Sequence, residues 1–259
     1  MENTSIRLLS TNGLSRHYGG VIALSEVTMA VHPGQIFSLI GPNGAGKTTL
    51  FNCVTGLDKP TFGTVEFLGE PISGLRPDEV TALGIGRTFQ NIRLFTDLTV
   101  LDNVKIGRHP RTESTFIGAV FRTQRQTSEE AAITERAHEM LTFVGLSNIS
   151  GQTAGNLSYG DQRRVEIARA LATEPKLLLL DEPAAGMNPQ ETQELIDLIY
   201  AIREQSVTVL LIEHDVKLVM QISDWVTVLD HGEKISEGEP ADVQNDERVI
   251  EAYLGVAEE

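Results

Sequence analysis

The chain begins with short apolar runs that alternate with polar turns. One run ends at residues 14–20, a second covers 23–31, and residues 36–40 are almost wholly apolar. Runs of this length bounded by turn residues are typical of β-strands, and we expect an antiparallel layer before residue 36. Further strands are expected at 64–68, 85–90, 176–181, 208–212, 225–229 and 234–236.

Helical periodicity separates several of these strands. Within residues 128–144, one predicted helical face carries Ile133, Ala137, Met140, Leu141 and Val144. Thr127 and Glu130 have the spacing of a capping box at the start of this helix, and Gly145 is expected to end it. Shorter helices are expected near 47–56, 77–83, 158–173, 189–202 and 247–254. Strands interleaved with helices predict an α/β fold.

The loop after residue 40 carries the clearest chemistry. Residues 41–48 read Gly-Pro-Asn-Gly-Ala-Gly-Lys-Thr, between an apolar strand and a helix-compatible segment. The glycines let successive N–H groups turn toward phosphate oxygens, and the helix adds the positive end of its dipole. Lys47 is expected to reach the β- and γ-phosphates, and the Thr48 hydroxyl to bind Mg²⁺. The nucleotide-binding set is Gly41, Asn43, Gly44, Ala45, Gly46, Lys47, Thr48 and Thr49.

A second segment also suits phosphate. Ser158 and Asp161 have capping-box spacing, so an ordinary capped helix is one interpretation. A serine hydroxyl and the close backbone of Gly160 at a helix start form an anion site as well. Both interpretations remain open on this motif alone.

Two adjacent carboxylates, Asp181 and Glu182, follow a buried strand. Paired carboxylates are costly there unless a cation lies beside them, and a Mg·nucleotide provides one. Asp181 is expected on the metal side, acting through water, and Glu182 is positioned to polarise the attacking water. His214 follows another apolar strand, at the edge where α/β sheets bind ligands, although a structural histidine is the alternative.

Composition narrows the class of protein. The 259 residues carry a net charge of −15, which argues against a surface that coats nucleic acid. Cys53 is the single cysteine, so an internal disulfide is excluded, and we expect it to be a small buried hydrophobe. The sequence shows neither a signal peptide nor an apolar run long enough to cross a bilayer.

Two features allow more than one interpretation. Tyr18 stands beside two glycines and is either an adenine-stacking platform or an ordinary strand-end residue. Residues 105–127 are basic within an acidic protein, and are either a solvated arm or a contact surface for anionic headgroups or a membrane partner. Its basic and apolar residues are Lys105, Arg108, Arg111, Phe116, Ile117, Val120, Phe121, Arg122 and Arg125.

In this order, these motifs resemble the ATP-binding-cassette (ABC) ATPases over nearly the whole chain. The resemblance implies roles for the Walker A loop at 41–48, the Q-loop residue Gln90, the signature motif at 157–161, Walker B at 177–181, the catalytic Glu182, the switch His214 and the A-loop Tyr18. It implies Gln90 both as a metal ligand and as part of the catalytic set. The signature reads Leu-Ser-Tyr-Gly-Asp and the D-loop has Asn188 where aspartate is usual, but Ser158 and Gly160 are intact.

The departures point to a subfamily. The stretches 157–170, 181–189, 211–220 and 252–255 look like those of the larger ATP-binding subunit of branched-chain amino-acid importers. The resemblance implies one ABC ATPase domain over 1–259, a P-loop NTPase core with an antiparallel β subdomain at about 1–90 and 166–259, and a helical subdomain at about 91–165. It also implies ATP and Mg²⁺ as cofactors, permease subunits and a second ATPase subunit as partners, and a peripheral place on the cytoplasmic face of the inner membrane.

The leading interpretation is a membrane-transport ATPase that binds MgATP, dimerises head to tail around two nucleotides and moves a partner's transmembrane helices. Other functions stay open at this stage. Relatives with nearly the same motifs import urea and short amides or extract lipopolysaccharide. A soluble cassette ATPase acting on DNA or ribosomes usually shows a long coiled-coil insertion or two fused cassettes, and this chain has neither. A regulator that binds nucleotide without turnover is opposed by the presence of Glu182 and His214.

Overall fold

The computed structural model describes residues 7–108 and 124–254, and it contains two sheets. The antiparallel sheet has the order β2-β1-β4-β5. Its strands are β1 (Leu9–Tyr18), β2 (Val21–Val31), β4 (Phe62–Phe67) and β5 (Glu70–Pro71). This sheet is the antiparallel layer that the N-terminal apolar runs predict.

The larger sheet has the order β10-β9-β3-β8-β7-β6. Its strands are β3 (Ile36–Ile40), β6 (Ile85–Arg87), β7 (Leu177–Asp181), β8 (Thr208–Ile212), β9 (Trp225–Asp230) and β10 (Glu233–Gly238). Five neighbouring strands run parallel, and only β10 pairs antiparallel, with β9. The carboxyl ends of β3, β7 and β8 therefore meet at one edge, where an α/β sheet binds its ligand.

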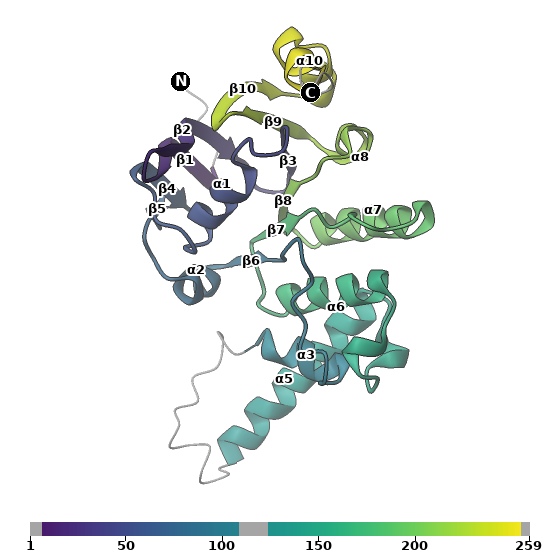
Figure 1. Ribbon diagram of the computed structural model, residues 1–259. Coiled ribbons are helices and arrows are strands. Elements are labelled where there is room, and N and C mark those ends of the chain that lie inside the picture. The colour runs from purple at the N-terminus through teal and green to yellow at the C-terminus, as the bar shows by residue number, and fades with distance from the viewer. Residues whose placement is uncertain (1–6, 109–123, 255–259) are drawn as a thin grey trace, which may run out of the picture.

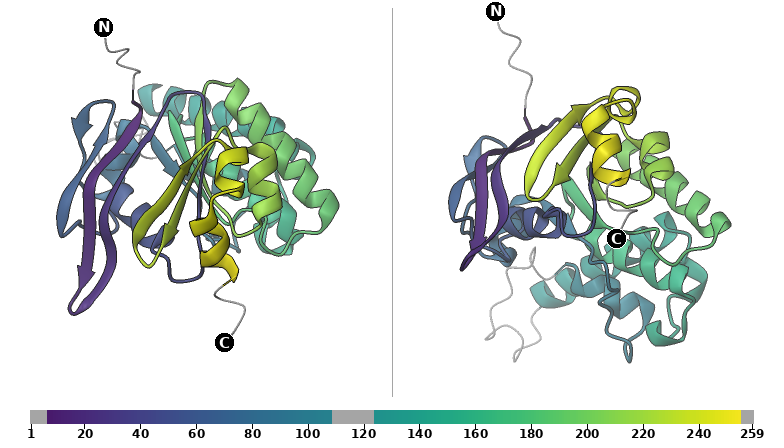
Figure 2. Two further views of the ribbon diagram at one scale, coloured as in Figure 1. Left: turned by 90° about the horizontal axis from the view of Figure 1, so that it is seen from above. Right: turned by 45° about the horizontal axis from the view of Figure 1, so that its top comes forward.

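The helices cover this sheet and extend away from it (Figure 1). They are α1 (Lys47–Val54), α2 (Pro77–Leu83), α3 (Val100–Ile106), α5 (Gln124–Phe143), α6 (Tyr159–Leu171), α7 (Pro189–Glu204), α8 (Val216–Ile222), α9 (Pro240–Gln244) and α10 (Glu247–Leu254). Figures 1 and 2 show α3, α5 and α6 gathered beyond the β6 edge, while α1 lies between the two sheets. The subdomain boundaries near 91 and 165 stay a prediction.

The core is divided by the central strands. Leu177 and Leu179 of β7 pack with α1 and the antiparallel sheet, whereas Leu178 and Leu180 pack with the helices on the other side. Alternate strand residues face opposite sides of a sheet, so both faces of β7 are buried. Cys53 of α1 is 1 % exposed, as expected for a small core residue, and burial raises the pKa of its thiol to about 11.

The strand expected at 85–90 is shorter than predicted. β6 ends at Arg87, although the Thr88 N–H still donates to the carbonyl of Leu179. The next two carbonyls, of Phe89 and Gln90, instead accept hydrogen bonds from Arg163 in α6. Because these carbonyls face a helix, the chain leaves the sheet and Gln90 stands in a loop.

The capping box predicted at Thr127 and Glu130 is wrong. α5 is described from Gln124, so both residues lie within the helix, and the Glu130 carbonyl accepts from the Thr134 hydroxyl as in a helix interior. The preceding Gln-Arg-Gln residues are good helix formers and extend the helix beyond the expected start. The predicted face is confirmed, since Ala137, Leu141 and Val144 are buried, and Gly145 ends the helix with φ 78°.

Part of the basic segment is integrated in the fold. The Lys105 ammonium lies 3.9 Å from the Glu130 carboxylate, and Arg108 pairs with Glu174 at 2.9 Å. Its other named residues either fall in 109–123, outside the described part of the chain, or have side chains that are not described. Within the described ranges, no helix is long and apolar enough to span a bilayer.

Candidate functional site

The phosphate loop connects β3 to α1, and its glycines are required by close contacts. Gly41 has φ 150°, and a Cβ there would lie 2.0 Å from the carbonyl oxygen of Leu229. Gly46 is the N-cap of α1 with φ 99°, and a Cβ there would lie 2.5 Å from the Ala23 carbonyl oxygen. Only glycine allows the loop this shape between β9 and β2.

Lys47 opens α1 and turns back over the loop. Its Nζ donates to the carbonyls of Gly41 at 2.7 Å and Pro42 at 2.9 Å, and the residue is 7 % exposed. Burial lowers the pKa of the Lys47 ammonium, while the nearby carboxylates of Glu182 and Asp181 act in the opposite direction. The predicted phosphate ligand and the two predicted acidic residues therefore share one site.

Asp181 ends β7 and is almost fully buried. Arg87 of the neighbouring strand β6 donates from Nη2 to Asp181 Oδ2 at 3.0 Å. Burial raises the pKa of the Asp181 carboxyl, and the Arg87 guanidinium lowers it. Sequence reasoning missed Arg87, because nothing in its local segment indicates a carboxylate partner 94 residues away.

Glu182 brings together the other predicted catalytic residues. Gln90 Nε2 donates to Glu182 Oε2 at 2.7 Å, and His214 Nδ1 lies 3.7 Å from the same oxygen. Glu182 has φ 46°, a left-handed conformation that costs free energy for a non-glycine residue and occurs preferentially at functional sites. The Q-loop and the segment after β8 thus meet at one carboxylate oxygen of Glu182, which follows β7.

A third acid, which the sequence analysis did not single out, lies next to His214. Glu213 is 1 % exposed and accepts hydrogen bonds from the backbone N–H groups of Ala184 and His214. Burial raises the pKa of the Glu213 carboxyl, and these two hydrogen bonds lower it. Glu213 therefore fixes the backbone after Glu182 and at His214.

Arg163 is a further residue whose role was missed. It is completely buried on α6 and donates to the carbonyls of Phe89 at 2.5 Å and Gln90 at 2.7 Å. It also pairs with Glu166 at 2.7 Å, and that partner is buried too. The spacing of Arg163 and Glu166 on one helix was a signal for the pair, but not for its contact with the Q-loop.

The signature residues lie at the start of α6, among the helices beyond the β6 edge (Figure 1). Ser158 is the N-cap; its hydroxyl accepts from the Asp161 N–H at 3.2 Å and donates to Asp161 Oδ2 at 2.9 Å. A Cβ on Gly160 would lie 3.0 Å from the Glu191 carboxylate. The predicted cap is confirmed, and its contacts are with its own helix rather than with the Lys47 site.

Tyr18 ends β1, and its ring is held in place. The hydroxyl donates to Asp58 Oδ2 at 2.5 Å, and the Arg16 guanidinium lies 4.3 Å from the ring centroid. Arg16 also pairs with Asp58 at 3.0 Å. Tyr18 remains 43 % exposed, so part of its ring is accessible to a ligand.

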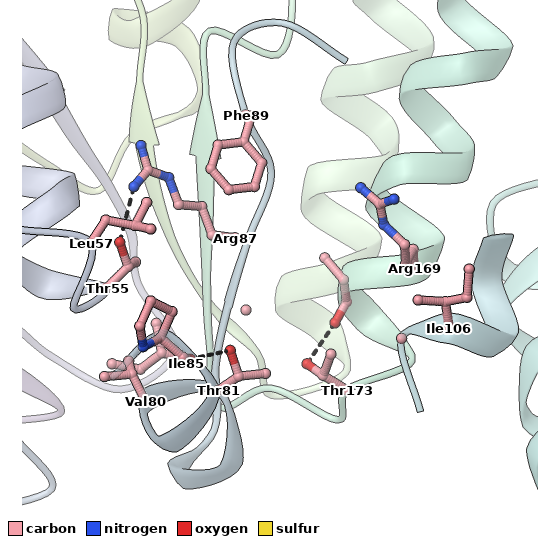
Figure 3. Close-up of a pocket in the computed structure, with 14 residues that line it drawn as sticks. Thr55, Leu57, Val80, Thr81, Ile85, Arg87, Phe89, Ile106, Arg169 and Thr173 are labelled. Carbon is pink, nitrogen blue, oxygen red and sulfur yellow. Dashed lines mark hydrogen bonds between the residues drawn. The ribbon is translucent and has the colours of Figure 1, made fainter. Parts of the chain in front are cut away.

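A pocket of about 280 Å³ lies between α2 and β6 on one side and α3 and α6 on the other (Figure 3). Its wall includes Thr55 and Leu57 after α1, Val80 of α2 and Ile106 of α3. The charged residues of its lining are Arg87 and Arg169. Because Arg87 also bonds to Asp181, one side chain joins this pocket to the phosphate site.

Residues 24–185 match the family described as ABC transporter. The chain belongs to this family. It is 45 % identical over 251 residues to the high-affinity branched-chain amino acid transport ATP-binding protein LivG of Escherichia coli (strain K12), covering 96 % of this chain and 98 % of LivG. Residues 233–259 match a second family, described as branched-chain amino acid ATP-binding cassette transporter.

Solved ABC cassettes have the same fold as this chain. The ADP conformation of MJ1267, an ATP-binding cassette of an ABC transporter, is 33 % identical with a TM-score of 0.83, over 96 % of this chain and 99 % of that one. The dimeric structure of MJ0796, a bacterial ABC transporter cassette, is 27 % identical with a TM-score of 0.75, over 90 % of this chain and 98 % of that one. The expected P-loop ABC ATPase fold is therefore confirmed.

Proposed function

We propose that this chain is the ATP-binding and ATP-hydrolysing subunit of an ABC importer for branched-chain amino acids. The main support for this substrate class is the 45 % identity to LivG over nearly the full length of both chains. The match of residues 233–259 supports it independently of the nucleotide-binding motifs. An importer of urea or short amides, or an exporter of lipopolysaccharide, is the alternative outcome of the substrate test.

MgATP fits the residues at the edge of β3, β7 and β8. The loop leaves no space for a Cβ atom at Gly41 or Gly46, and the buried ammonium group of Lys47 lies near the carboxylates Asp181 and Glu182. Lys47 and the loop N–H groups would bind the phosphates, and Tyr18 would stack on adenine. Thr48, Gln90 and Asp181 would hold Mg²⁺, which neutralises charge on the phosphate oxygens.

Glu182 is the proposed base for hydrolysis. Its carboxylate would orient a water toward the γ-phosphate and accept the proton that this water loses, giving ADP and phosphate. Gln90 is hydrogen-bonded to one oxygen of this carboxylate and would hold it in place, and His214 Nδ1 lies 3.7 Å from the same oxygen. This arrangement favours turnover over a purely regulatory nucleotide site.

Two chains are proposed to complete each site. Ser158 and Gly160 begin a helix that suits phosphate, but the Ser158 contacts described here are with Asp161 of its own helix. The dimeric structure of the MJ0796 cassette supports a dimer. In the proposed dimer, the signature residues of one subunit serve the nucleotide on the other. The second subunit is either a related chain or another copy of this one, and the boundaries near 91 and 165 would separate the core from the moving helical part.

Permease subunits are the proposed membrane partners, with this chain peripheral on the cytoplasmic face of the inner membrane. The pocket of Figure 3 is the proposed docking surface. Its apolar lining with Arg87 and Arg169 suits a short apolar segment that carries an acidic side chain. Occupation of this pocket would reach the phosphate site through the Arg87 side chain.

A gene deletion in the source organism tests the function. The strain without this chain should lose uptake of leucine, isoleucine and valine while urea uptake is unchanged, and the intact gene should restore it. A Lys47→Ala gene should fail to restore it. Loss of urea uptake alone, or unchanged uptake of all four solutes, would contradict the proposed substrate.

A further inference from the structure

Arg87 is a buried cation that bonds to two different elements of the phosphate site. Its Nη1 donates to Asn52 Oδ1 at 2.8 Å and to Thr55 Oγ1 at 2.9 Å, in and just after the last turn of α1. Its Nη2 donates to Asp181 Oδ2 at 3.0 Å, at the end of β7. One guanidinium with 7 % side-chain exposure therefore connects α1 to β7.

Both of these elements carry a predicted magnesium ligand. Thr48 lies in the first turn of α1, four residues before Asn52, and Asp181 ends β7. A helix moves as a unit because each turn is hydrogen-bonded to the next. Mg²⁺ demands nearly ideal octahedral geometry, so the position of Thr48 relative to Asp181 must be closely fixed.

The surroundings of Arg87 suit it to fixing the position of Asp181 relative to α1. The centroids of the Phe51 and Phe89 rings lie 5.5 and 5.0 Å from its guanidinium carbon, so the planar group packs against two aromatic side chains. A planar fork fixed in this way imposes an orientation on its acceptors. In the bonds described, it engages one oxygen of Asp181, which leaves the other oxygen for a water or a cation.

We propose that Arg87 is a positioning residue for magnesium, which fixes the Asp181 carboxylate relative to α1 so that Thr48 and Asp181 meet one metal ion. The inference rests on the proposed function, in which these two residues bind the metal of MgATP. Arg87 itself touches neither the metal nor the nucleotide in this role. A buried ion pair that merely stabilises the fold is the alternative to be tested.

The test measures metal response without turnover. The full chain carries Glu182→Gln, a fluorescent ATP analogue is bound in EDTA, and Mg²⁺ is titrated until the fluorescence change is complete. Arg87→Met should raise the midpoint Mg²⁺ concentration roughly tenfold, the usual size of an effect on metal affinity from a residue behind a ligand. Affinity for the analogue in EDTA should change by less than about twofold, because the phosphate loop is intact.

Arg203→Met is the matched control. Arg203 is also an arginine paired with a carboxylate, at 3.4 Å from Asp224, but it lies on α7 in an exposed pair. Its midpoint should stay within about twofold of the parent. A double variant, Arg87→Met with Asp181→Asn, should have the midpoint of Asp181→Asn alone, because residues that act through one another are not additive.

Two results would overturn the inference: an unchanged midpoint in Arg87→Met, even with a lower melting temperature, or an additive further shift in the double variant. If Arg87→Met does not fold, Arg87→Gln removes the same charge and is subject to the same two outcomes. Failure of the proposed function would be detected separately, in the parent chain that carries only Glu182→Gln. A parent that binds the analogue but does not respond to Mg²⁺ would contradict the metal assignment of Asp181 before any Arg87 variant is measured.

Discussion

Gln90 and Glu182 are joined by a hydrogen bond of 2.7 Å from the glutamine amide to Oε2 of the carboxylate. The two residues come from different parts of the fold, the loop after β6 and the end of β7. Arg163 of α6 holds the carbonyl of Gln90, so the signature helix is connected to Glu182 through two hydrogen bonds. A displacement of α6 would therefore change the surroundings of the proposed base.

Glu182→Gln removes the carboxylate and keeps nearly the same size and hydrogen-bonding capacity. We expect ATP affinity to stay within a few-fold of the unmodified chain, because Lys47 and the loop are untouched. Turnover should fall roughly 10²-fold or more, since water is no longer activated by a base. Phosphate release and nucleotide binding, measured on the same preparation, check the two parts.

The glutamine variant should also accumulate as an ATP-bound dimer, which size-exclusion chromatography with ATP would detect. Glu204→Gln, which alters an exposed carboxylate at the end of α7, is a control for loss of charge alone. Normal turnover in Glu182→Gln would remove Glu182 from the catalytic role.

Arg163→Met tests the connection between α6 and the Q-loop. The change leaves the carbonyls of Phe89 and Gln90 without this donor and leaves Glu166 buried beside a weaker partner, Arg169 at 3.6 Å. Breaking a buried ion pair from one side typically costs about 3–5 kcal/mol. Urea unfolding should therefore show a large loss of stability.

Arg164→Met is the matched control on the same helix. Arg164 pairs with Asp161 at 2.6 Å but is partly exposed, so its loss should cost less than about 1 kcal/mol. Adding Glu166→Leu to Arg163→Met should recover part of the stability, because no unpaired carboxylate remains buried. Equal stability of the Arg163→Met and Arg164→Met variants would contradict the role assigned to the buried pair.

Tyr18→Ala should weaken ATP binding by ~1 to 2 kcal/mol if the ring stacks on adenine. Tyr18→Phe loses the hydrogen bond to Asp58 but keeps the ring, so its ATP affinity should change little. Turnover at saturating ATP should survive in both, because the triphosphate site is separate. Titration of a fluorescent ATP analogue would measure the affinities. Equal affinities for the alanine variant and the unmodified chain would show that Tyr18 is only a strand-end residue.

Much of the sheet could be predicted because β3, β7 and β8 are buried on both faces and are almost wholly apolar in sequence. The phosphate loop could be predicted because its glycines, lysine and flanking elements are contiguous. The early end of β6 at Arg87 could not be predicted, since it depends on a contact between Arg163 and Gln90, which are 73 residues apart. Arg87 was missed for the same reason: its partner is set by the register of β6 against β7, which local patterns do not contain.

The last prediction asks which subunit completes each site. Lys47→Ala should inactivate the phosphate loop, and Ser158→Arg should block the signature helix, so each variant alone should be inactive. In a mixed dimer of the proposed kind, one site carries both lesions and the other carries neither. Roughly half of randomly formed dimers would be mixed, so combining the two inactive variants should restore part of the ATP hydrolysis.

The experiment needs a control for dimer formation. If the natural partner is a related but different ATPase subunit, two copies of this chain associate weakly, so mixing belongs at a protein concentration where the unmodified chain hydrolyses ATP. Lys47→Ala mixed with Asp181→Asn is the matched negative, because both lesions fall on the same half of a site and every site in a mixed dimer stays defective. Activity from the first mixture but not the second would assign Ser158 to the opposite subunit's nucleotide. If neither mixture recovers activity while the unmodified chain is active, Ser158 acts within its own chain and the shared-site dimer is wrong.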